Sequence, residues 1–322
     1  MNTTFDNENQ GTGTMFRRSA SIGILTYRRP EEVKRCLEAV VAAIAEPMPD
    51  SWSVDEVMVI DNDPDGSARA VVSKLAERTV SAASIRYVHE PRAGVSIARN
   101  RAMAEAAGDV LVFIDDDEIP HEGWPHGLLT VLDETGAAMV GGPVLTEFTA
   151  PPPRWIVDGR FFDRDDAPHR SARAWLRSGN LAIDLEQVRG AGLLFDPRYR
   201  QGEDSAFTRA ARAAGLELRW SSVGAITEFV GADRFSTRWR ARREYLSNRA
   251  WTRSSLDLAD GATGRAASRA RVATVALARA GQGLALMAAG LWPGRADRRA
   301  EGLAVWAGVG GRIVEIMAYR RP

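Results

Sequence analysis

Three consecutive aspartates, Asp115, Asp116 and Asp117, directly follow an apolar run over residues 110–114. Neighbouring carboxylates repel one another, and a divalent cation held between them and a diphosphate would relieve that repulsion. If the apolar run is a buried strand, the carboxylates lie at the rim of a sheet, where a hydrated cation has access. A solvated acidic turn is the competing interpretation, and the preceding strand favours the metal site over it.

A second acidic pair, Glu203 and Asp204, opens a predicted helix after Gly202. Acidic residues are common at a helix N-terminus, where they cap free amides and interact favourably with the helix dipole. Taken alone, the pair is therefore explained by capping. Together with the first acidic site it has a chemical use, because a carboxylate within hydrogen-bond reach of a hydroxyl can act as its general base.

Further polar residues follow other predicted strands. Asp61 could accept hydrogen bonds from a nucleobase or a ribose hydroxyl, although residues 61–66 also form a good turn sequence. Arg92, Arg99 and Asn100 lie around the start of a predicted helix, where guanidinium groups and helix amides together can bind phosphate. For each of these three residues, a role as ordinary surface charge or polarity is an equal alternative.

The elements that must position these residues alternate along the first half of the chain. Apolar runs predict buried strands at residues 21–26, 57–60, 85–88 and 110–114. Helical spacing lies between them, at residues 30–45, 67–77 and 94–107. This alternation predicts an α/β fold with a mainly parallel sheet covered by helices, which binds ligands at the carboxyl ends of its strands. A further strand is expected at 138–144, and residues 154–178 are expected to be irregular.

Length and composition limit the function classes. A chain of 322 residues accommodates one large domain, or one domain with an appendage, and 26% charged with 45% hydrophobic residues excludes a disordered protein. Because 42 basic residues balance 42 acidic ones, the overall charge gives no nucleic-acid signal. The single Cys36 excludes an intrachain disulfide and fits a reducing, cytoplasmic compartment. No signal peptide is expected, and residues 1–18 are expected to be a mobile tail.

The C-terminal part differs in character. Residues 234–253 contain seven arginines interleaved with Trp239, Tyr245 and Trp251, a mixture that suits a diphosphate, a membrane surface, stacked nucleic-acid bases or simple solvation. Residues 272–292 and 303–319 form apolar segments, but Arg279 is costly at the centre of a bilayer. We therefore expect these helices to lie on a membrane or to pack on a second subunit, rather than to span the bilayer.

The motifs together resemble family 2 glycosyltransferases of the GT-A fold, and most nearly the bacterial exopolysaccharide enzymes of the succinoglycan type. The resemblance covers roughly residues 20–250. It rests on eight segments in the family's order, ILTYRRP, VIDND, GVSIARNRA, GDVLVFIDDDE, GGPV, SGNLAI, GEDSAF and AITEFVGADR. No single segment is decisive, but eight in order are highly specific.

The resemblance implies a nucleotide diphosphate sugar donor and a glycan or lipid-linked acceptor, with no nucleic-acid partner. Asp115 and Asp117 would be the outer residues of a DXD motif that holds Mn²⁺ or Mg²⁺. Asp204 would be the catalytic base, with Glu203 orienting it or the acceptor. The donor would be bound by a larger set: Thr26, Tyr27, Arg28, Asp61, Arg92, Arg99, Asn100, Asp115, Asp116 and Asn180. The implied organisation is a tail (1–18), a GT-A domain (19–253) and a C-terminal helical, membrane-associating region (254–322).

One departure from the family concerns the segment that contains Thr227, Glu228 and Phe229. Many relatives have a histidine after the glutamate, where it approaches the metal or the diphosphate, and here that position is Phe229. The four histidines of the chain lie elsewhere. Metal affinity is therefore expected to be weaker, while the predicted reaction remains an inverting, single-displacement transfer.

Three other functions compete with a sugar transfer. A sugar nucleotidyltransferase usually needs a glycine-rich, basic loop near the N-terminus, which ILTYRRP does not supply. A dinucleotide-dependent oxidoreductase is disfavoured because no G-x-G-x-x-G sequence follows the first predicted strand. A sugar-nucleotide or polysaccharide binding module without catalysis stays open, since intact acidic residues do not by themselves prove turnover.

Overall fold

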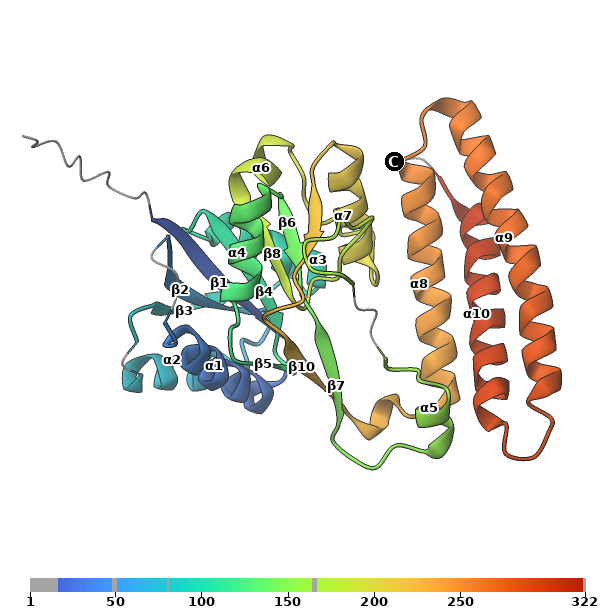
Figure 1. Cartoon of the computed structure of the whole chain (residues 1–322), viewed down its shortest axis with the longest axis horizontal. Helices are drawn as coiled ribbons and strands as arrows, with labels where there is room; N and C mark the ends of the chain where they lie inside the picture. The colour runs from blue at the N-terminus through green and yellow to red at the C-terminus, as the bar shows by residue number, and fades with distance from the viewer. Residues whose placement is uncertain (1–16, 48–50, 80, 164–166, 321–322) are drawn as a thin grey trace, which may run out of the picture.

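The computed structural model describes residues 17–47, 51–79, 81–163 and 167–320. Figure 1 shows a sheet covered by helices, with three long helices standing beside it at the C-terminal end. Of the expected N-terminal tail, residues 1–16 lie outside the described residues, and the first strand already begins at Arg18.

The main sheet has seven strands in the order β3-β2-β1-β4-β8-β6-β9. Their bounds are β1 Arg18–Thr26, β2 Trp52–Asp61, β3 Ser84–His89, β4 Val110–Asp115, β6 Met139–Gly141, β8 Leu181–Asp184 and β9 Leu218–Trp220. Only β8 runs antiparallel to its neighbours, β4 and β6. The carboxyl ends of six strands and the amino end of β8 therefore meet at one edge, and the predicted mixed, mainly parallel sheet is confirmed.

Helices cover both faces of this sheet, because successive strand side chains point to opposite sides. Ile22 and Ile24 of β1 pack in one core with α1, α2 and α4, whereas Leu25 packs in a second core with α3, α6 and α7. The bounds are α1 Pro30–Ile44, α2 Arg69–Arg78, α3 Val95–Glu105, α4 His126–Thr135, α6 Leu185–Gly190 and α7 Glu203–Ala213. Pro30 occupies the first turn of α1, as its fixed backbone angle favours.

The strand expected at 138–144 is wrong as a single element. The chain forms β6 in the main sheet and then β7 (Val144–Phe148) in a second sheet. The break occurs at Gly142 and Pro143, since Gly142 donates its amide to the carbonyl of Asn180 and Pro143 has no amide to continue the ladder. Within 154–178, the described residues 154–163 and 167–178 are irregular as expected, apart from the short α5 (Arg154–Asp158).

The second sheet has three strands in the order β5-β10-β7, with β5 spanning Glu118–Pro120 and β10 spanning Ile226–Val230. Its register places Glu118 of β5 opposite Glu228 of β10. The short helix η1 (Ala232–Arg234) follows β10. This sheet thus brings residues 226–234 close to the three aspartates at and just after the end of β4.

Three helices complete the chain, α8 (Thr237–Asp257), α9 (Gly261–Ala289) and α10 (Ala296–Ala318). Arg249 and Arg253 of α8 donate to the buried carboxylate of Glu315 in α10, at 3.0 and 2.7 Å. The boundary expected between residues 253 and 254 falls inside α8, which packs on α10 from within its first half. The helical unit therefore begins at Thr237.

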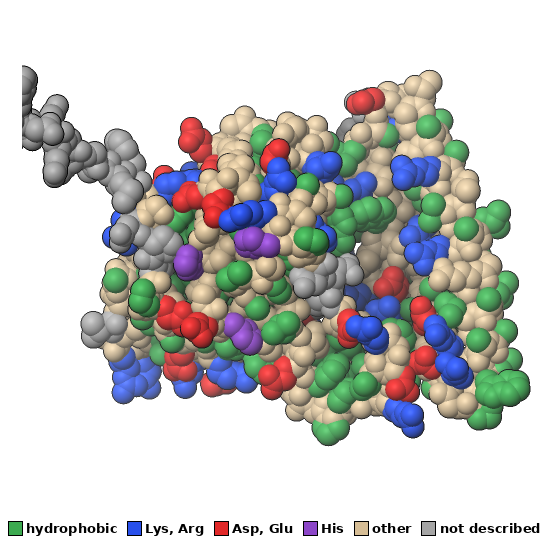
Figure 2. Space-filling view, in the orientation of Figure 1, with side chains coloured by type: hydrophobic (Ala, Val, Ile, Leu, Met, Phe, Trp, Pro, Cys, Tyr) green, Lys and Arg blue, Asp and Glu red, His purple; other side chains and the backbone are tan. Residues whose placement is uncertain are grey.

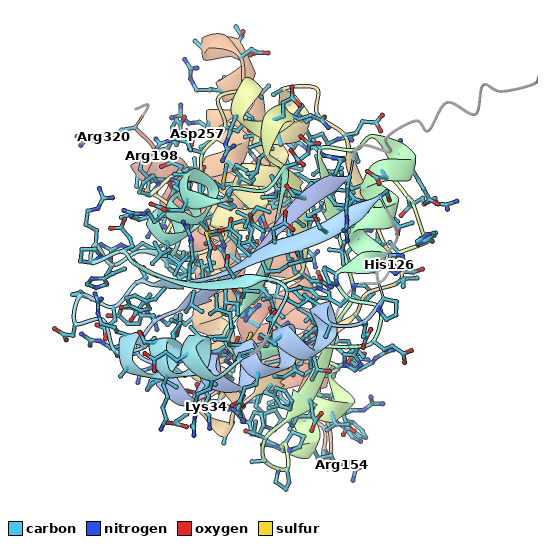
Figure 3. All side chains as sticks on the ribbon, turned by 90° about the vertical axis from the view of Figure 1, so that its left-hand side faces the viewer. Lys34, His126, Arg154, Arg198, Asp257 and Arg320 are labelled. Carbon is cyan, nitrogen blue, oxygen red and sulfur yellow. The ribbon has the colours of Figure 1, made fainter. Side chains whose placement is uncertain are left out.

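The helical unit is also attached to the loop before α7. Arg198 lies beside Asp257, the last residue of α8, at 3.4 Å, and the hydroxyl of Tyr199 donates to the same carboxylate at 2.9 Å (Figure 3). The hydroxyl of Tyr319, just after α10, donates to the other oxygen of Asp257 at 2.7 Å. One carboxylate thus joins the sheet-containing part to two of the three helices.

Candidate active site

The three consecutive aspartates lie at the carboxyl edge of the sheet, and Asp116 and Asp117 accept hydrogen bonds from arginines. Asp116 is buried and accepts hydrogen bonds from the hydroxyl of Thr26 at 2.8 Å and from Arg29 at 3.0 Å. Asp117 accepts from Arg29 at 3.0 Å and from Arg234 at 2.8 Å. Burial raises the pKa of Asp116 to about 6, with Thr26 and Arg29 opposing the shift.

Arg29 and Arg234 were not among the residues predicted to form the site. Arg29 follows β1 directly, so its place in the segment ILTYRRP was a usable signal. Arg234 lies in η1, and besides Asp117 it contacts Glu228 of β10 at 2.6 Å. This is the stretch in which relatives carry the missing histidine, so a guanidinium stands here beside the third aspartate.

Arg99 connects the two acidic sites. Its guanidinium is only 3% exposed, donates to the carboxylate of Glu203 at the start of α7, and lies 3.6 Å from Asp115. Burial raises the pKa of Asp115, and the negative charges of Asp117 and Asp204 raise it further, while Arg99 opposes the shift. Burial likewise raises the pKa of Glu203 against the effect of Arg99. The end of β4 and the start of α7 therefore form one electrostatic unit.

Asp204 lies next to Glu203 on the first turn of α7 and is half-buried. One carboxylate oxygen, Oδ1, accepts from the amide of Ser205 at 2.6 Å and from its hydroxyl at 3.3 Å. Its second oxygen has no hydrogen bond within the described part of the chain. Gly202, with a left-handed φ of 74°, allows the sharp entry into the helix that presents both acids to the edge of the sheet.

Asp61 lies at the same edge, at the end of β2, and is fully buried. Its oxygens accept from the amides of Asp63 at 3.1 Å and Ala68 at 2.8 Å, and from the hydroxyl of Tyr87 at 2.9 Å. Burial and the hydrogen bond to Asp61 raise the pKa of Tyr87 to about 12. The carboxylate thus folds the loop that leads into α2.

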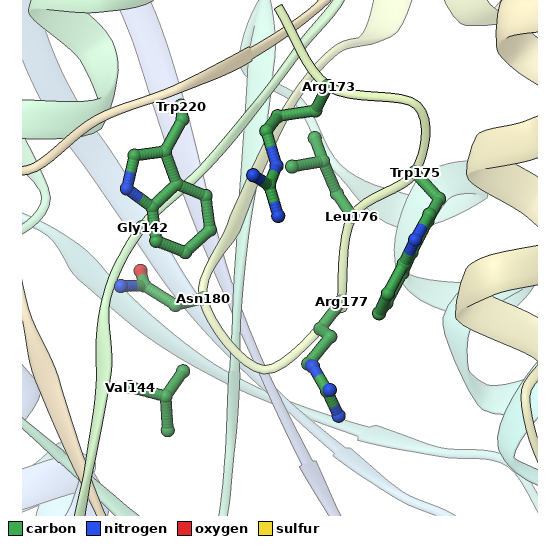
Figure 4. Close-up of a pocket in the computed structure, with 8 residues that line it drawn as sticks. All are labelled: Gly142, Val144, Arg173, Trp175, Leu176, Arg177, Asn180 and Trp220. Carbon is green, nitrogen blue, oxygen red and sulfur yellow. The ribbon is translucent and has the colours of Figure 1, made fainter. Parts of the chain in front are cut away.

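The side chains of the two predicted asparagines, Asn100 and Asn180, also form hydrogen bonds with backbone groups. Asn100 makes two hydrogen bonds of 2.8 Å to the amide and carbonyl of Phe195. Asn180 donates to the carbonyls of Pro143 and Gly224, and accepts from the indole of Trp124 at 3.0 Å. Asn180 lines a pocket, as Figure 4 shows, with its amide fully engaged.

The remaining predicted donor-binding residues are more exposed. Tyr27 is partly exposed after β1, and Arg28 has an unusual left-handed φ of 58° and pairs with Asp63 at 3.1 Å. Arg92 pairs with the buried Glu90 at 2.9 Å and keeps a largely exposed side chain. These side chains border the β1–β3 half of the edge and can turn toward a ligand.

The donor set at Asp115 and Asp117 fits a hard divalent cation. Both residues offer carboxylate oxygens at the rim. Burial raises the pKa of Asp115, and the negative charge of Asp117 adds to the shift, so a cation placed between the two would be favoured. Among the described residues, no group of three or more His, Cys, Asp or Glu is arranged to hold a metal ion. A cation held here would therefore take its other ligands from water and diphosphate oxygens, as Mg²⁺ prefers.

Comparisons with known proteins show which family the chain resembles. A model of the family described as glycosyl transferase family 2 matches residues 21–182. The succinoglycan biosynthesis protein ExoM of Rhizobium meliloti (strain 1021) is 34% identical over 250 residues, which cover 74% of this chain and 76% of that protein. The glycosyltransferase AglE of Haloferax volcanii is 26% identical over 62% of this chain and 64% of its own length.

A solved structure shows the same fold. The mannosyltransferase PcManGT from Pyrobaculum calidifontis, in complex with GDP-Man and Mn²⁺, superposes with a TM-score of 0.57 over 92% of this chain and 88% of that chain, at 17% identity. The GT-A fold predicted from the sequence is thereby confirmed. With a family model over half of its length and a relative at 34% identity, the chain belongs to glycosyl transferase family 2 and is a glycosyltransferase.

Proposed function

We propose that this glycosyltransferase transfers a sugar, with inversion, from a nucleotide diphosphate sugar to a hydroxyl of a glycan or lipid-linked glycan. One observation carries the proposal: Arg99 contacts both Asp115, at the end of β4, and Glu203, at the start of α7. The carboxylates that could hold a cation therefore lie close to the half-buried Asp204, which follows Glu203. The related ExoM is a succinoglycan biosynthesis protein, which supports a role in cell-surface polysaccharide synthesis.

In this mechanism Asp204 is the base. The Asp204 oxygen that makes no hydrogen bond removes the proton of the acceptor hydroxyl. The oxygen of this hydroxyl attacks the anomeric carbon at the same time, from the face opposite the diphosphate. The new glycosidic bond forms as the bond to the nucleoside diphosphate breaks. Glu203, fixed by Arg99, holds the first turn of α7 in place, so that the base meets the acceptor in a set orientation.

The charge of the leaving group must also be stabilised. Asp115 and Asp117 would hold Mn²⁺ or Mg²⁺, which when bound supplies positive charge next to the diphosphate. Arg29 and Arg234 already contact Asp117, so their guanidinium groups are within reach of the same phosphates and can bind the oxygens bidentately. The solved relative with GDP-Man and Mn²⁺ supports this class of donor and cation.

A panel of UDP-, GDP- and dTDP-sugars, measured for thermal stabilisation with and without Mn²⁺ or Mg²⁺, tests the donor site. Binding to the folded state raises the melting temperature by mass action, so the true donor should stand out. Asp204→Asn is expected to keep this stabilisation and to lower turnover by about 100-fold or more, the scale of general-base catalysis. Product analysis by NMR should show the inverted anomeric configuration.

The outcomes separate the competing functions. A binding module without catalysis would respond to a donor but show no difference between Asp204→Asn and the unchanged chain. Release of pyrophosphate from a sugar phosphate and a nucleoside triphosphate would identify a nucleotidyltransferase. Retention of configuration would contradict the role given to Asp204, and no response to any donor would remove the nucleotide-sugar site.

We also propose that the enzyme is cytoplasmic and contacts the inner face of the membrane through its C-terminal helices. α9 has one 18-residue window with a mean hydropathy of 1.4, of which 11% is buried. Figure 2 shows hydrophobic and basic side chains together over the helical part of the molecule. A peripheral position would bring the active site to a lipid-linked acceptor.

A further inference from the structure

A pocket opens at the sheet edge, on the side of β4 away from Asp61. Its enclosed space is about 30 Å³, and it is lined by Arg173, Trp175, Leu176, Arg177, Asn180 and Trp220 among others. Figure 4 shows the guanidinium of Arg173 pointing into the space between the indoles of Trp220 and Trp175. A space of this size holds about two water molecules, so it admits a carboxylate or phosphate group, with the rest of the ligand at its mouth.

The pocket is adjacent to the proposed base. The backbone amide of Leu176 donates to the hydroxyl of Thr208 at 3.0 Å, and the same hydroxyl donates to the carbonyl of Asp204 at 2.9 Å. One threonine of α7 thus fixes both the pocket wall and the turn that carries the base. The strand order places Asp61 on the opposite half of the edge, so the nucleotide and this pocket lie on either side of β4.

Two guanidinium groups of the pocket are held by aromatic rings rather than by acids. Arg173 stacks over Trp220 at 5.2 Å and Arg177 stacks over Trp175 at 5.3 Å. Within the described part of the chain, neither guanidinium has a hydrogen bond or an ion pair to a carboxylate. Stacking keeps each group planar and positioned while leaving its N–H edge for an anion.

The surroundings add positive charge. Arg243 of α8 stacks on Trp239 at 5.3 Å and has no carboxylate partner among the described residues. Burial lowers its pKa, and the nearby Arg177, Arg234 and Arg240 lower it further. Basic side chains therefore extend from the pocket toward Arg234, which pairs with Asp117 and Glu228.

We propose that this pocket binds the acceptor through an anionic group, a carboxylate or a phosphate, carried by its sugar residue. The proposal rests on the transferase function above only in calling the ligand an acceptor. Leu176 and Val144 supply apolar surface for the C–H face of a sugar ring, and the two stacked guanidiniums supply charge-assisted hydrogen bonds. A neutral sugar would leave both guanidiniums without an anionic partner.

Direct binding in the absence of donor and metal tests this inference independently of turnover. Calorimetry with methyl β-glucuronide, methyl β-glucoside and glucose 1-phosphate compares carboxylate, neutral and phosphate forms of one sugar. The charged form that fits should bind about tenfold or more tightly than the glucoside, the scale of one charge-assisted hydrogen bond. Arg173→Gln and Arg177→Gln should each remove that advantage, whereas the exposed Arg35→Gln on α1 should not.

The two charged probes distinguish the sources of the anion. Preference for the glucuronide assigns an acidic sugar within the glycan, and preference for glucose 1-phosphate assigns the phosphate of a lipid-linked sugar; either supports the inference. Equal affinity for the glucoside, or an advantage that survives both substitutions, would overturn it. If the protein binds its donor but neither anionic sugar, the proposed transferase function still stands and only the anion-binding pocket is contradicted.

Discussion

Arg99 is the residue on which the geometry of the site depends. It is almost fully buried, and it is the shared counter-ion of Asp115 on β4 and Glu203 on α7, elements that the chain reaches nearly ninety residues apart. Desolvating three charged groups is expensive, and only their mutual attraction offsets it. The three charged groups therefore contribute more to the orientation of the site than to the free energy of folding. Through Arg99, the carboxylates proposed to bind the cation are also coupled to the turn that carries the proposed base.

Removing one member of this group should be more harmful than removing two. Arg99→Gln leaves the buried Glu203 and the partly exposed Asp115 without this cation and should lower the free energy of unfolding by roughly 3 kcal/mol, mostly through Glu203. The double variant Arg99→Gln with Glu203→Gln should recover part of that loss, because one of the stranded charges is gone. Urea unfolding of the single and double variants measures this, and strict additivity would contradict the coupling.

Arg234 offers a second test at the residue scale. Its guanidinium lies 2.8 Å from an oxygen of Asp117, so a cation must compete with it for that carboxylate. Arg234→Gln should therefore bind Mn²⁺ more tightly without donor, by about tenfold, as measured by electron paramagnetic resonance of free Mn²⁺. The exposed Arg238→Gln is the matched control. Unchanged Mn²⁺ affinity in Arg234→Gln would mean that Asp117 is not a metal ligand.

These residues also show what sequence patterns can and cannot reveal. Asp115, Asp117 and Asp204 could be selected because each follows or opens an element whose periodicity is visible. Arg234 could not, since its partner Asp117 lies 117 residues away and no local rule links them. The engagement of Asn100 and Asn180 with backbone groups was equally hidden, because a polar side chain that fixes a loop and one that binds a ligand look alike in sequence.

At the scale of elements, periodicity predicted the first four strands and three helices, because β1, β4 and the second half of β2 are buried on both faces. The prediction missed the first half of β2, where polar residues interrupt the apolar run. It failed where tertiary contacts decide. The run at 138–144 reads as one strand, but the chain changes sheets at Gly142 and Pro143. The boundary at 253 was placed where the composition changes, whereas α8 continues through it to pack on α10.

The contact between α8 and α10 depends on small residues. A Cβ atom at Gly311 of α10 would overlap the carbonyl oxygen of Tyr245 in α8, whereas one at Gly281 of α9 would meet nothing within 4 Å. Gly311→Ala should thus force the helices apart and cost about 1–3 kcal/mol. Gly281→Ala should be neutral or stabilise by up to about 1 kcal/mol, since alanine favours the helix.

Melting curves followed by circular dichroism compare these two alanine variants directly. A lower melting temperature for Gly311→Ala alone supports close packing of α8 on α10. The same shift in both variants would show that helix propensity, and not the helix contact, sets the effect.

At the scale of the whole molecule, the exposed face of α9 stands out. Leu277 and Leu284 lie seven residues apart, so they share one side of the helix, and Leu291 and Trp292 follow just after its end. The first and last of these leucines are 78% and 79% exposed, and Trp292 is 77% exposed. From Arg265 onward the chain has ten arginines against three acids, which complements an anionic lipid surface.

Vesicle binding tests whether this face meets a membrane. The full chain should sediment with vesicles of phosphatidylglycerol and phosphatidylcholine, and less so with phosphatidylcholine alone or at high salt, because salt screens the arginines. Leu284→Glu should lower the partition coefficient by about tenfold or more, since burying one leucine contributes about 1.5–3 kcal/mol. Leu194→Glu changes an equally exposed leucine near α7 and should have no effect. If both variants bind vesicles alike, the apolar face of α9 contacts something other than lipid, and a second subunit becomes the explanation for its exposure.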